Sequence, residues 1–171
     1  GSVVGSSFGS VMCSSFGSAT ISAVAATLEF KGKQAKPIPG VYKVRCKSHF
    51  PSVRCKTPAL AGRWFYQVVI EGQGQNMQIG WSTSDFHAEK RGGCGDDALS
   101  WAFDGCVGKK WHNGEMESYP DLGPGDSLQK QLQLVWRKGD ILGCSVNISA
   151  NSANNEIRYF LNGVDLGVAF S

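Results

Sequence analysis

The chain has 171 residues, of which 42% are hydrophobic and 18% charged, and this balance favours one globular domain with a real core over an intrinsically disordered protein. Its formal net charge of +3 is too small for the concentrated basic surface of a nucleic-acid-binding protein, so we expect no nucleic-acid partner. No apolar run approaches the length that spans a bilayer, and no secretory signal pattern is visible, which predicts a cytoplasmic or nuclear protein without a membrane partner.

The six cysteines lie far apart and form no C-x-x-C pair: Cys13, Cys46, Cys55, Cys94, Cys106 and Cys144. Zinc ligands usually come in close pairs, and disulfide-dense domains are usually shorter and secreted. We therefore predict no metal site and no disulfide among these thiols. Cys144 falls in an apolar strand pattern and is expected to be a small buried residue.

Residues 1–40 are expected to form an N-terminal arm and connector. Gly and Ser dominate residues 1–18, where Ser-Ser-Phe-Gly-Ser occurs twice, yet several apolar side chains accompany them. Part of this arm is therefore expected to pack on the domain or on a neighbouring copy, which makes it a candidate for self-association. Residues 20–30 are compatible with a strand or a short helix, because their periodicity does not decide between the two. Pro37 and Pro39 mark the connector that follows.

The stretch at residues 63–81 predicts a β-hairpin. Its first half is rich in aromatic and β-branched residues, which suit a pleated, half-buried surface. Gly72 and Gly74 then allow the positive φ angles of a tight turn, and residues 77–81 pair back. The core between two sheets is expected to include Trp64, Trp81, Val146 and Tyr159.

Strands separated by turns continue to the end of the chain. Residues 141–148 show the period-two alternation of a sheet with one buried face. Asn162-Gly163 is a strong hairpin signal, Asn113-Gly114 is a second turn pair, and residues 119–134 predict a loop with at most a short helix. Further short strands are predicted at residues 41–47, 52–56, 100–104, 107–112, 156–161 and 164–169. Such closely spaced strands and turns predict an all-β sandwich.

Catalytic and ligand-binding interpretations are weaker than structural ones. The Gly-x-Gly at residues 72–74 lacks the third glycine and the helix of a dinucleotide site. Cys106 and His112 are candidates for a thiol–imidazole pair, but on a strand-turn-strand unit their proximity is more simply incidental. Oxygen ligands for a cation are available from Asp96, Asp97 and Asp104. The favoured alternative is that Asp96 and Asp97 accept backbone N–H bonds in a turn, and that the tryptophans are core residues rather than a ligand cage. We expect no enzyme activity and no cofactor.

Five motifs in order resemble those of SPRY domains. They read Gly-Arg-Trp-Phe-Tyr-Gln-Val at residues 62–68, Met-Gln-Ile-Gly-Trp at 77–81, Gly-Asp-Asp at 95–97 followed by Ser-Trp-Ala-Phe-Asp-Gly at 100–105, Trp-Arg-Lys-Gly-Asp-Ile-Leu-Gly-Cys at 136–144, and Phe-Leu-Asn-Gly-Val-Asp-Leu-Gly-Val-Ala-Phe at 160–170. Each motif alone is modest, but five in this order are specific. The chain is most similar to the SPRY domains of a large RING-type ubiquitin ligase and of ryanodine receptors.

The resemblance implies a bent, antiparallel β-sandwich of the SPRY type at residues 41–171. Such a domain is a non-catalytic protein-interaction module, which binds a short peptide or partner surface through loops at one end. Here it would be the substrate or partner receptor of a larger protein such as a ubiquitin ligase. The alternative is a structural or scaffolding domain that packs within its own parent chain, as in a channel or another large assembly.

Three features depart from the family pattern. Asn147 stands where the family has Asp, and residues 119–134 look like an insertion. Family members continue with closing strands beyond the position of Ser171, so we expect either a truncated domain or a substitute for the missing piece. Our hypothesis is that residues 3–30 cover the open strand edge, in cis or from a neighbouring copy, because open edges invite pairing with another chain.

In the resembling family the corresponding loops meet at one end of the sandwich, and loops on a rigid scaffold often carry binding groups. This implies a partner-binding surface formed by residues 47–51, 84–91 and 112–115. Its expected apolar anchors are Phe50 and Phe86, while cationic and amide groups would bind carboxylates and peptide backbone. For any one of these residues taken alone, an ordinary solvent-exposed loop position is a simpler interpretation than a binding role. The predicted contact residues are Lys47, His49, Phe50, Phe86, His87, Arg91, His112, Asn113 and Glu115.

Overall fold

The computed structural model describes residues 18–22, 28–30, 35–38, 41–45, 53–55, 58–71, 77–87, 93–121, 135–150 and 152–171, with side chains from residue 58 onward. These residues are nearly all in β-strands, with one short 3-10 turn, η2 (Ser152–Asn154). The predicted all-β class is therefore confirmed. Predictions for residues 46–52, 72–76, 88–92 and 122–134 are not tested, because these ranges lie outside the described residues.

The larger sheet has seven antiparallel strands in the order β13-β12-β11-β6-β1-β4-β3. Its strands are β1 (Ser18–Ser22), β3 (Ala35–Ile38), β4 (Val41–Arg45), β6 (Gly62–Ile70), β11 (Ile141–Ile148), β12 (Glu156–Leu161) and β13 (Val164–Phe170). The pairing of β6 with β11 runs from Val69↔Ile141 to Gly62↔Ile148 and joins the two halves of the sheet. A separate pair is formed by β2 (Leu28–Phe30) and β5 (Val53–Cys55).

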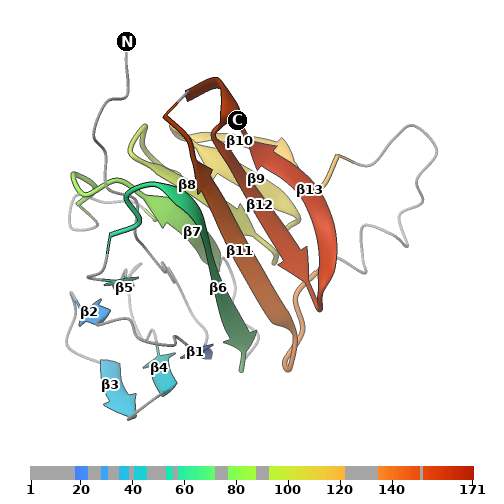
Figure 1. The fold of residues 1–171 in the computed structure, drawn as a ribbon. Helices are drawn as coiled ribbons and strands as arrows, with labels where there is room; N and C mark the ends of the chain where they lie inside the picture. Colours follow the sequence, from blue (N-terminus) through green and yellow to red (C-terminus); the bar gives the residue numbers. More distant parts are fainter. Residues whose placement is uncertain are drawn as a thin grey trace.

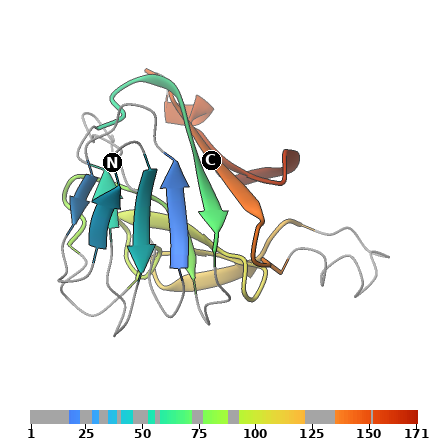
Figure 2. The ribbon, with the colours of Figure 1, turned by 90° about the horizontal axis from the view of Figure 1, so that it is seen from below.

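The smaller sheet has four antiparallel strands in the order β10-β9-β8-β7. They are β7 (Gln78–Ser82), β8 (Ser100–Asp104), β9 (Lys109–His112) and β10 (Glu115–Ser118). In Figure 1 this sheet lies behind β11, β12 and β13, and the view from below in Figure 2 shows it as a separate layer under the curved larger sheet. The molecule is thus a bent sandwich of two sheets, as the sequence predicted.

The core lies between the two sheets and is built largely from aromatic side chains. Trp81 is only 4% exposed, and Val146 and Tyr159 are also buried, which confirms three of the four core residues predicted from the sequence. Tyr66 from β6 donates a hydrogen bond from its hydroxyl to the Gly80 carbonyl on β7, over 2.7 Å, and packs edge-on against Trp81. One side chain thereby joins the larger sheet to the smaller one by both a polar and an apolar contact.

Trp64 is the fourth predicted core residue, and its placement in the core is wrong. Its side chain is 38% exposed, although its register partner Val146 is buried on the same face of the sheet. The reason is its position near the start of β6, where the first four residues of the strand are all exposed. There the indole N–H donates to the Ala61 carbonyl at 2.9 Å instead of packing between the sheets.

The Asn-Gly turns adopt the geometry that their sequence predicts. Asn113 and Gly114 have φ angles of 54° and 75°, and Asn162 and Gly163 have φ angles of 52° and 83°. Positive φ at both central residues is the requirement of a type I′ hairpin turn, whose twist matches that of the flanking strands. The first turn joins β9 to β10, and the second joins β12 to β13.

The turn interpretation of the acidic pair before β8 is also confirmed. Asp96 accepts a hydrogen bond from the Gly93 N–H at 2.6 Å, and Asp97 accepts one from the Leu99 N–H at 3.0 Å. Asp97 also accepts a bond from the Ser100 hydroxyl at 2.7 Å. These carboxylates therefore hold the loop that leads into β8 and are occupied by main-chain and hydroxyl donors.

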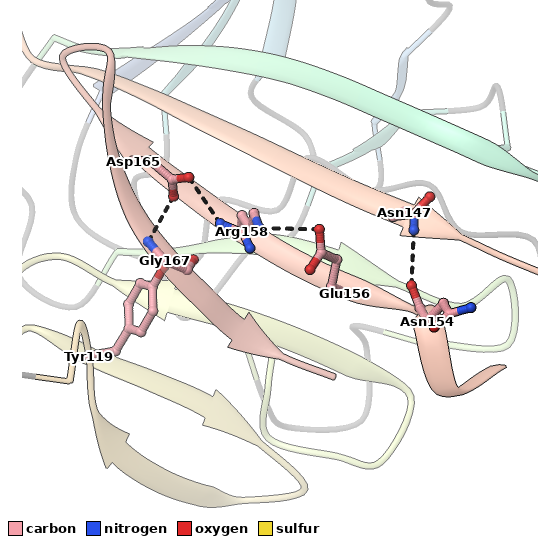
Figure 3. A network of polar contacts seen from close by, with 7 residues as sticks. All are labelled: Tyr119, Asn147, Asn154, Glu156, Arg158, Asp165 and Gly167. Carbon is pink, nitrogen blue, oxygen red and sulfur yellow. Dashed lines mark hydrogen bonds and ion pairs between the residues drawn. The ribbon is translucent and has the colours of Figure 1, made fainter. Parts of the chain in front are cut away.

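β13 is one of the two edge strands of the larger sheet, and three side chains, one of them its own, bond its main-chain groups. The Tyr119 hydroxyl donates to the Gly167 carbonyl at 2.8 Å, and Lys110 Nζ donates to the Ala169 carbonyl at 2.8 Å. Asp165 accepts a bond from the Gly167 N–H at 2.8 Å, next to the Tyr119 contact in Figure 3. Because free main-chain groups on an edge strand attract other chains, these three bonds protect the edge.

The expectation that the arm at residues 3–30 covers the edge beside the C-terminal hairpin in cis is wrong for the described part of the arm. β1 instead pairs with β6 and β4, from Ala19↔Ile70 to Ser22↔Gln67 on the β6 side. It therefore extends the sheet on the side away from β13. The physical reason is that β6 offers a long row of main-chain donors and acceptors there, whereas side chains already bond main-chain groups on β13.

Removing the Trp81 side chain tests the core. Trp81→Ala should lower the free energy of unfolding by about 3–5 kcal/mol, because it opens a large cavity between the sheets. Trp64→Ala is the matched control, and we expect a loss of only about 1–2 kcal/mol because the indole is partly exposed. Urea denaturation curves of both variants check this, and equal losses would contradict the assigned burial.

Removing the two donors that reach β13, Lys110 on β9 and Tyr119 after β10, tests the edge protection. Tyr119→Phe combined with Lys110→Met keeps the apolar parts of both side chains but removes both donors. We expect this variant to self-associate more than the parent, as measured by light scattering after size-exclusion chromatography. Lys109→Met is the control, because Lys109 bonds Ser118 and not β13. A double variant as monodisperse as the control would refute the role.

The buried carboxyl of Asp104 predicts a pH dependence of stability. Burial raises the pKa of Asp104 from 3.8 to about 6, so the folded state holds the proton more tightly than the unfolded state. The associated stabilisation is present at low pH and is lost as pH rises from about 4 to about 6, an effect of about 3 kcal/mol.

Asp104→Asn should therefore raise stability at pH 7.5 and flatten the pH dependence between pH 4 and pH 7. The amide oxygen can still accept the Cys106 N–H bond, which spans 2.9 Å in the parent. Thermal melts across this range measure the effect. Parallel profiles for parent and variant would show that the carboxyl does not titrate in this window.

Candidate functional site

A hollow of about 450 Å³ opens between the inner face of the smaller sheet and the end of β13. This volume lies within the range of roughly 300–1,000 Å³ that is typical of ligand pockets. We call it the inter-sheet hollow, and its lining residues are Trp101, Lys110, His112, Glu115, Glu117, Ala169, Phe170 and Ser171.

The register of β8, β9 and β10 places these side chains on one face. Trp101 pairs with His112, which pairs with Glu115 on the next strand. In the adjacent row Lys110 pairs with Glu117. Because side chains alternate between the two faces of a strand, residues 110 and 112 point to the same face, as do residues 115 and 117. The two-residue Asn-Gly turn between β9 and β10 sets this register.

An aromatic wall forms one side of the inter-sheet hollow. The rings of Trp101 and His112 stack with centroids 4.8 Å apart and planes 9° apart, and His112 meets Phe170 edge-on at 6.2 Å. His112 Nδ1 lies 2.8 Å from the Ser100 carbonyl oxygen. Because a carbonyl oxygen only accepts, Nδ1 is the donor, and in the neutral ring Nε2 keeps its lone pair. The imidazole is therefore held in one orientation.

Lys110 connects the two sides of the inter-sheet hollow. Its Nζ lies 2.8 Å from the Ala169 carbonyl, 2.9 Å from the Glu117 carboxylate and 5.4 Å from the centre of the Phe170 ring. The hydrogen bond from Lys110 lowers the pKa of the Glu117 carboxyl. Lys110 is therefore committed to contacts within the domain, which fix the position of β13 relative to β9.

Three of the predicted contact residues come together at this place. His112 and Glu115 line the inter-sheet hollow, and Asn113 is exposed on the turn between them. The Asn113 N–H donates to the Asp97 carbonyl at 3.0 Å, so the loop before β8 supports the turn. His87 is exposed on the described segment after β7. Lys47, His49, Phe50 and Arg91 lie outside the described residues.

Phe86 is not an exposed anchor, and this part of the sequence prediction needs correction. Its side chain is 6% exposed and lies in a small apolar cluster with Cys94 and Ala102, against which Trp111 packs. This cluster covers the outer face of the smaller sheet, opposite the inter-sheet hollow. Phe86 therefore attaches the loop after β7 to the domain. Burying its ring stabilises the folded state and leaves little of the side chain available to a partner.

Sequence reasoning missed Trp101, Lys110, Glu117 and Phe170 as lining residues. A signal for two of them was present, since a two-residue turn at Asn113-Gly114 dictates that residue 110 faces residue 117. Phe170 carried no comparable signal, because its approach to His112 joins segments that are distant in the sequence.

The described side chains include three cysteines, of which two are buried. Cys94, Cys106 and Cys144 are free thiols, and burial raises the pKa values of Cys94 and Cys144. No group of three or more His, Cys, Asp and Glu side chains that could hold a metal ion occurs within the described ranges. No helix in the described part of the chain is long and apolar enough to cross a membrane. What the hollow offers is an ordered aromatic wall beside carboxylates.

Several known proteins resemble this chain over part of their length, and three of them illustrate the range. The E3 ubiquitin-protein ligase RKP of Arabidopsis thaliana is 35% identical over 122 residues, which are 71% of this chain and 8% of the relative. The Ran-binding proteins 9/10 homolog of Drosophila melanogaster is 30% identical over 75% of this chain and 12% of its own length. The ATP-dependent RNA helicase DDX1 of Xenopus laevis is 29% identical over 64% of this chain and 12% of its own length. The chain thus spans about a tenth of the length of these relatives.

A family model described as the SPRY domain matches residues 63–171. That range holds β6 through β13, which include both sides of the inter-sheet hollow. The sequence motifs, the two-sheet topology and this match agree, and SPRY domains are generally protein-interaction modules. The chain therefore belongs to the SPRY domain family.

Proposed function

We propose that this SPRY domain is a non-catalytic receptor that docks a short peptide segment of a partner protein in the inter-sheet hollow, beside the Asn113-Gly114 turn. The observation that carries the proposal is the ordered wall of Trp101 and His112 next to the Glu115 carboxylate. A few fixed polar groups within a largely preformed concave surface are typical of ligand sites. The wall is preorganised, so binding a segment there costs little ordering of the domain itself.

The contacts of His112 support binding rather than catalysis. Its Nδ1 bonds the Ser100 carbonyl and its ring stacks on Trp101, so no interaction within the described part of the chain directs it to a nucleophile. A catalytic imidazole would be expected within hydrogen-bond reach of the group that it activates. His112 serves instead as part of a flat aromatic surface with one remaining ring nitrogen.

The relatives suggest a biological setting for such a receptor. One is named as an E3 ubiquitin-protein ligase and another as a Ran-binding protein homolog, and in each case this chain matches a small part of the relative. We therefore propose that the domain recruits a substrate or partner to a larger protein such as a ubiquitin ligase, and that it acts in the cytoplasm or nucleus.

A scaffolding role is the second candidate, and one surface favours it. The outer face of the larger sheet exposes Phe65, which is 55% exposed and packs edge-on against Phe160 at 5.8 Å. Val168 and Ile141 are exposed on the same face. Arg158 lies among them with ion pairs to Glu156 at 3.1 Å and Asp165 at 3.0 Å (Figure 3). An apolar face with its charges paired internally would suit packing within a parent chain.

Selection of peptides from a random displayed library on the folded domain tests the proposal. We expect the selected peptides to bind with micromolar affinity, because a short segment buries little surface and must be ordered. His112→Ala should weaken them by about tenfold or more, since it removes half of the aromatic stack. The measurement is fluorescence anisotropy with a labelled peptide.

Phe65→Ala is the matched control, since it removes an exposed aromatic ring from the opposite surface of the larger sheet. Both variants are first shown to melt as cooperatively as the parent. Equal binding by His112→Ala and the parent would place the receptor site elsewhere. Loss of binding in Phe65→Ala alone would favour the outer face and the scaffolding role.

A further inference from the structure

The inter-sheet hollow has more negative than positive side chains, and one of its carboxylates is in an ion pair. One ammonium group, that of Lys110, faces two carboxylates, those of Glu115 and Glu117. Lys110 and Glu117 form an ion pair at 2.9 Å, and Lys110 also donates a hydrogen bond to the Ala169 carbonyl. Glu115 has no ion-pair partner among the described residues. The hollow therefore presents one uncompensated negative charge to an incoming group.

The Glu115 carboxylate is a polar group of this surface that accepts hydrogen bonds without donating any. His112 already uses Nδ1 in the bond to the Ser100 carbonyl. The indole of Trp101 and the ring of Phe170 supply aromatic surface beside them. A partner that fits must bring donors, a positive charge and a flat group.

An arginine side chain meets all three requirements better than a lysine side chain. The guanidinium group is planar, carries five N–H donors, stacks on aromatic rings and is more weakly hydrated than an ammonium ion. It can also bind a carboxylate through two parallel hydrogen bonds, which a single ammonium cannot reproduce. Lysine would bring the charge, but it has no planar group and cannot form two parallel hydrogen bonds to one carboxylate.

We propose that the inter-sheet hollow binds the guanidinium group of an arginine residue in the docked partner segment, and that Glu115 is its carboxylate partner. This inference rests on the proposed function, because it names the side chain that the receptor recognises. It assigns the aromatic wall of Trp101 and His112 to one flat face of the guanidinium and leaves the Lys110–Glu117 pair as a fixed part of the domain.

The direct test is a titration with blocked tripeptides, which requires no knowledge of the natural partner. The probes are acetyl-Gly-Arg-Gly-amide, its lysine analogue and its citrulline analogue, which keeps the shape of arginine without the charge. Nuclear magnetic resonance signals of the Trp101 indole N–H and the His112 amide report on the hollow. We expect the arginine probe to bind with a Kd on the order of 1 mM, with citrulline about tenfold weaker and lysine in between.

Glu115→Gln provides the second arm, because it removes the charge and keeps the size of the side chain. It should weaken the arginine probe by about fivefold or more and leave the citrulline probe unchanged. Glu156→Gln is the matched control, since Glu156 pairs with Arg158 on the outer face of the larger sheet. Added salt should weaken the arginine probe in the parent.

Two results would overturn the inference. One is equal binding of the arginine and citrulline probes, and the other is an arginine affinity that Glu115→Gln does not change. Both leave the receptor role intact if library-selected peptides still lose affinity in His112→Ala. Failure of every peptide to respond to His112→Ala would instead reject the site itself, so the two failures are distinguishable.

Discussion

The packing of three aromatic rings around Phe103 holds the sandwich together. Phe103 on β8 meets Tyr119 and Trp136 at 5.2 Å and Tyr159 on β12 at 5.4 Å, in edge-on or tilted arrangements. Such geometries add to the large apolar area that each ring buries. Because β8 belongs to the smaller sheet and β12 to the larger one, this cluster sets how the two layers lie, and the inter-sheet hollow opens where the cluster ends.

Tyr119 links this core to the edge of the larger sheet. Its ring packs against Phe103 and Tyr159 while its hydroxyl bonds the Gly167 carbonyl of β13. Lys110 acts in parallel, with its ammonium on the Ala169 carbonyl. Both residues thus satisfy main-chain acceptors that would otherwise be open on an edge strand. The same bonds hold the end of β13 against the smaller sheet and thereby form the second wall of the hollow.

The two faces of the smaller sheet differ in polarity, because side chains alternate between the faces of each strand. Phe86, Cys94 and Ala102, with Trp111, form an apolar cluster on the outer face. The inner face beyond the aromatic core carries Lys110, His112 and the two glutamates, which are too polar to be sealed between the sheets. An alternating strand thus stabilises the domain with one set of side chains and leaves the other set lining the hollow.

The amino-acid sequence by itself determined most strands from β6 onward, the Asn113-Gly114 and Asn162-Gly163 turns, the turn role of Asp96 and Asp97, and the family. These features depend on neighbours only a few residues apart, so period, turn chemistry and motif order are enough to read them. The sequence did not predict β10, and it placed β3 in a connector. Only the tertiary structure decided that Trp64 is exposed, that Phe86 is buried, and that β1 joins β6. It also decided that Lys110 reaches Ala169, 59 residues along the chain. Such outcomes depend on where one sheet ceases to cover the other, and a local pattern gives the face of a side chain but not what lies opposite it.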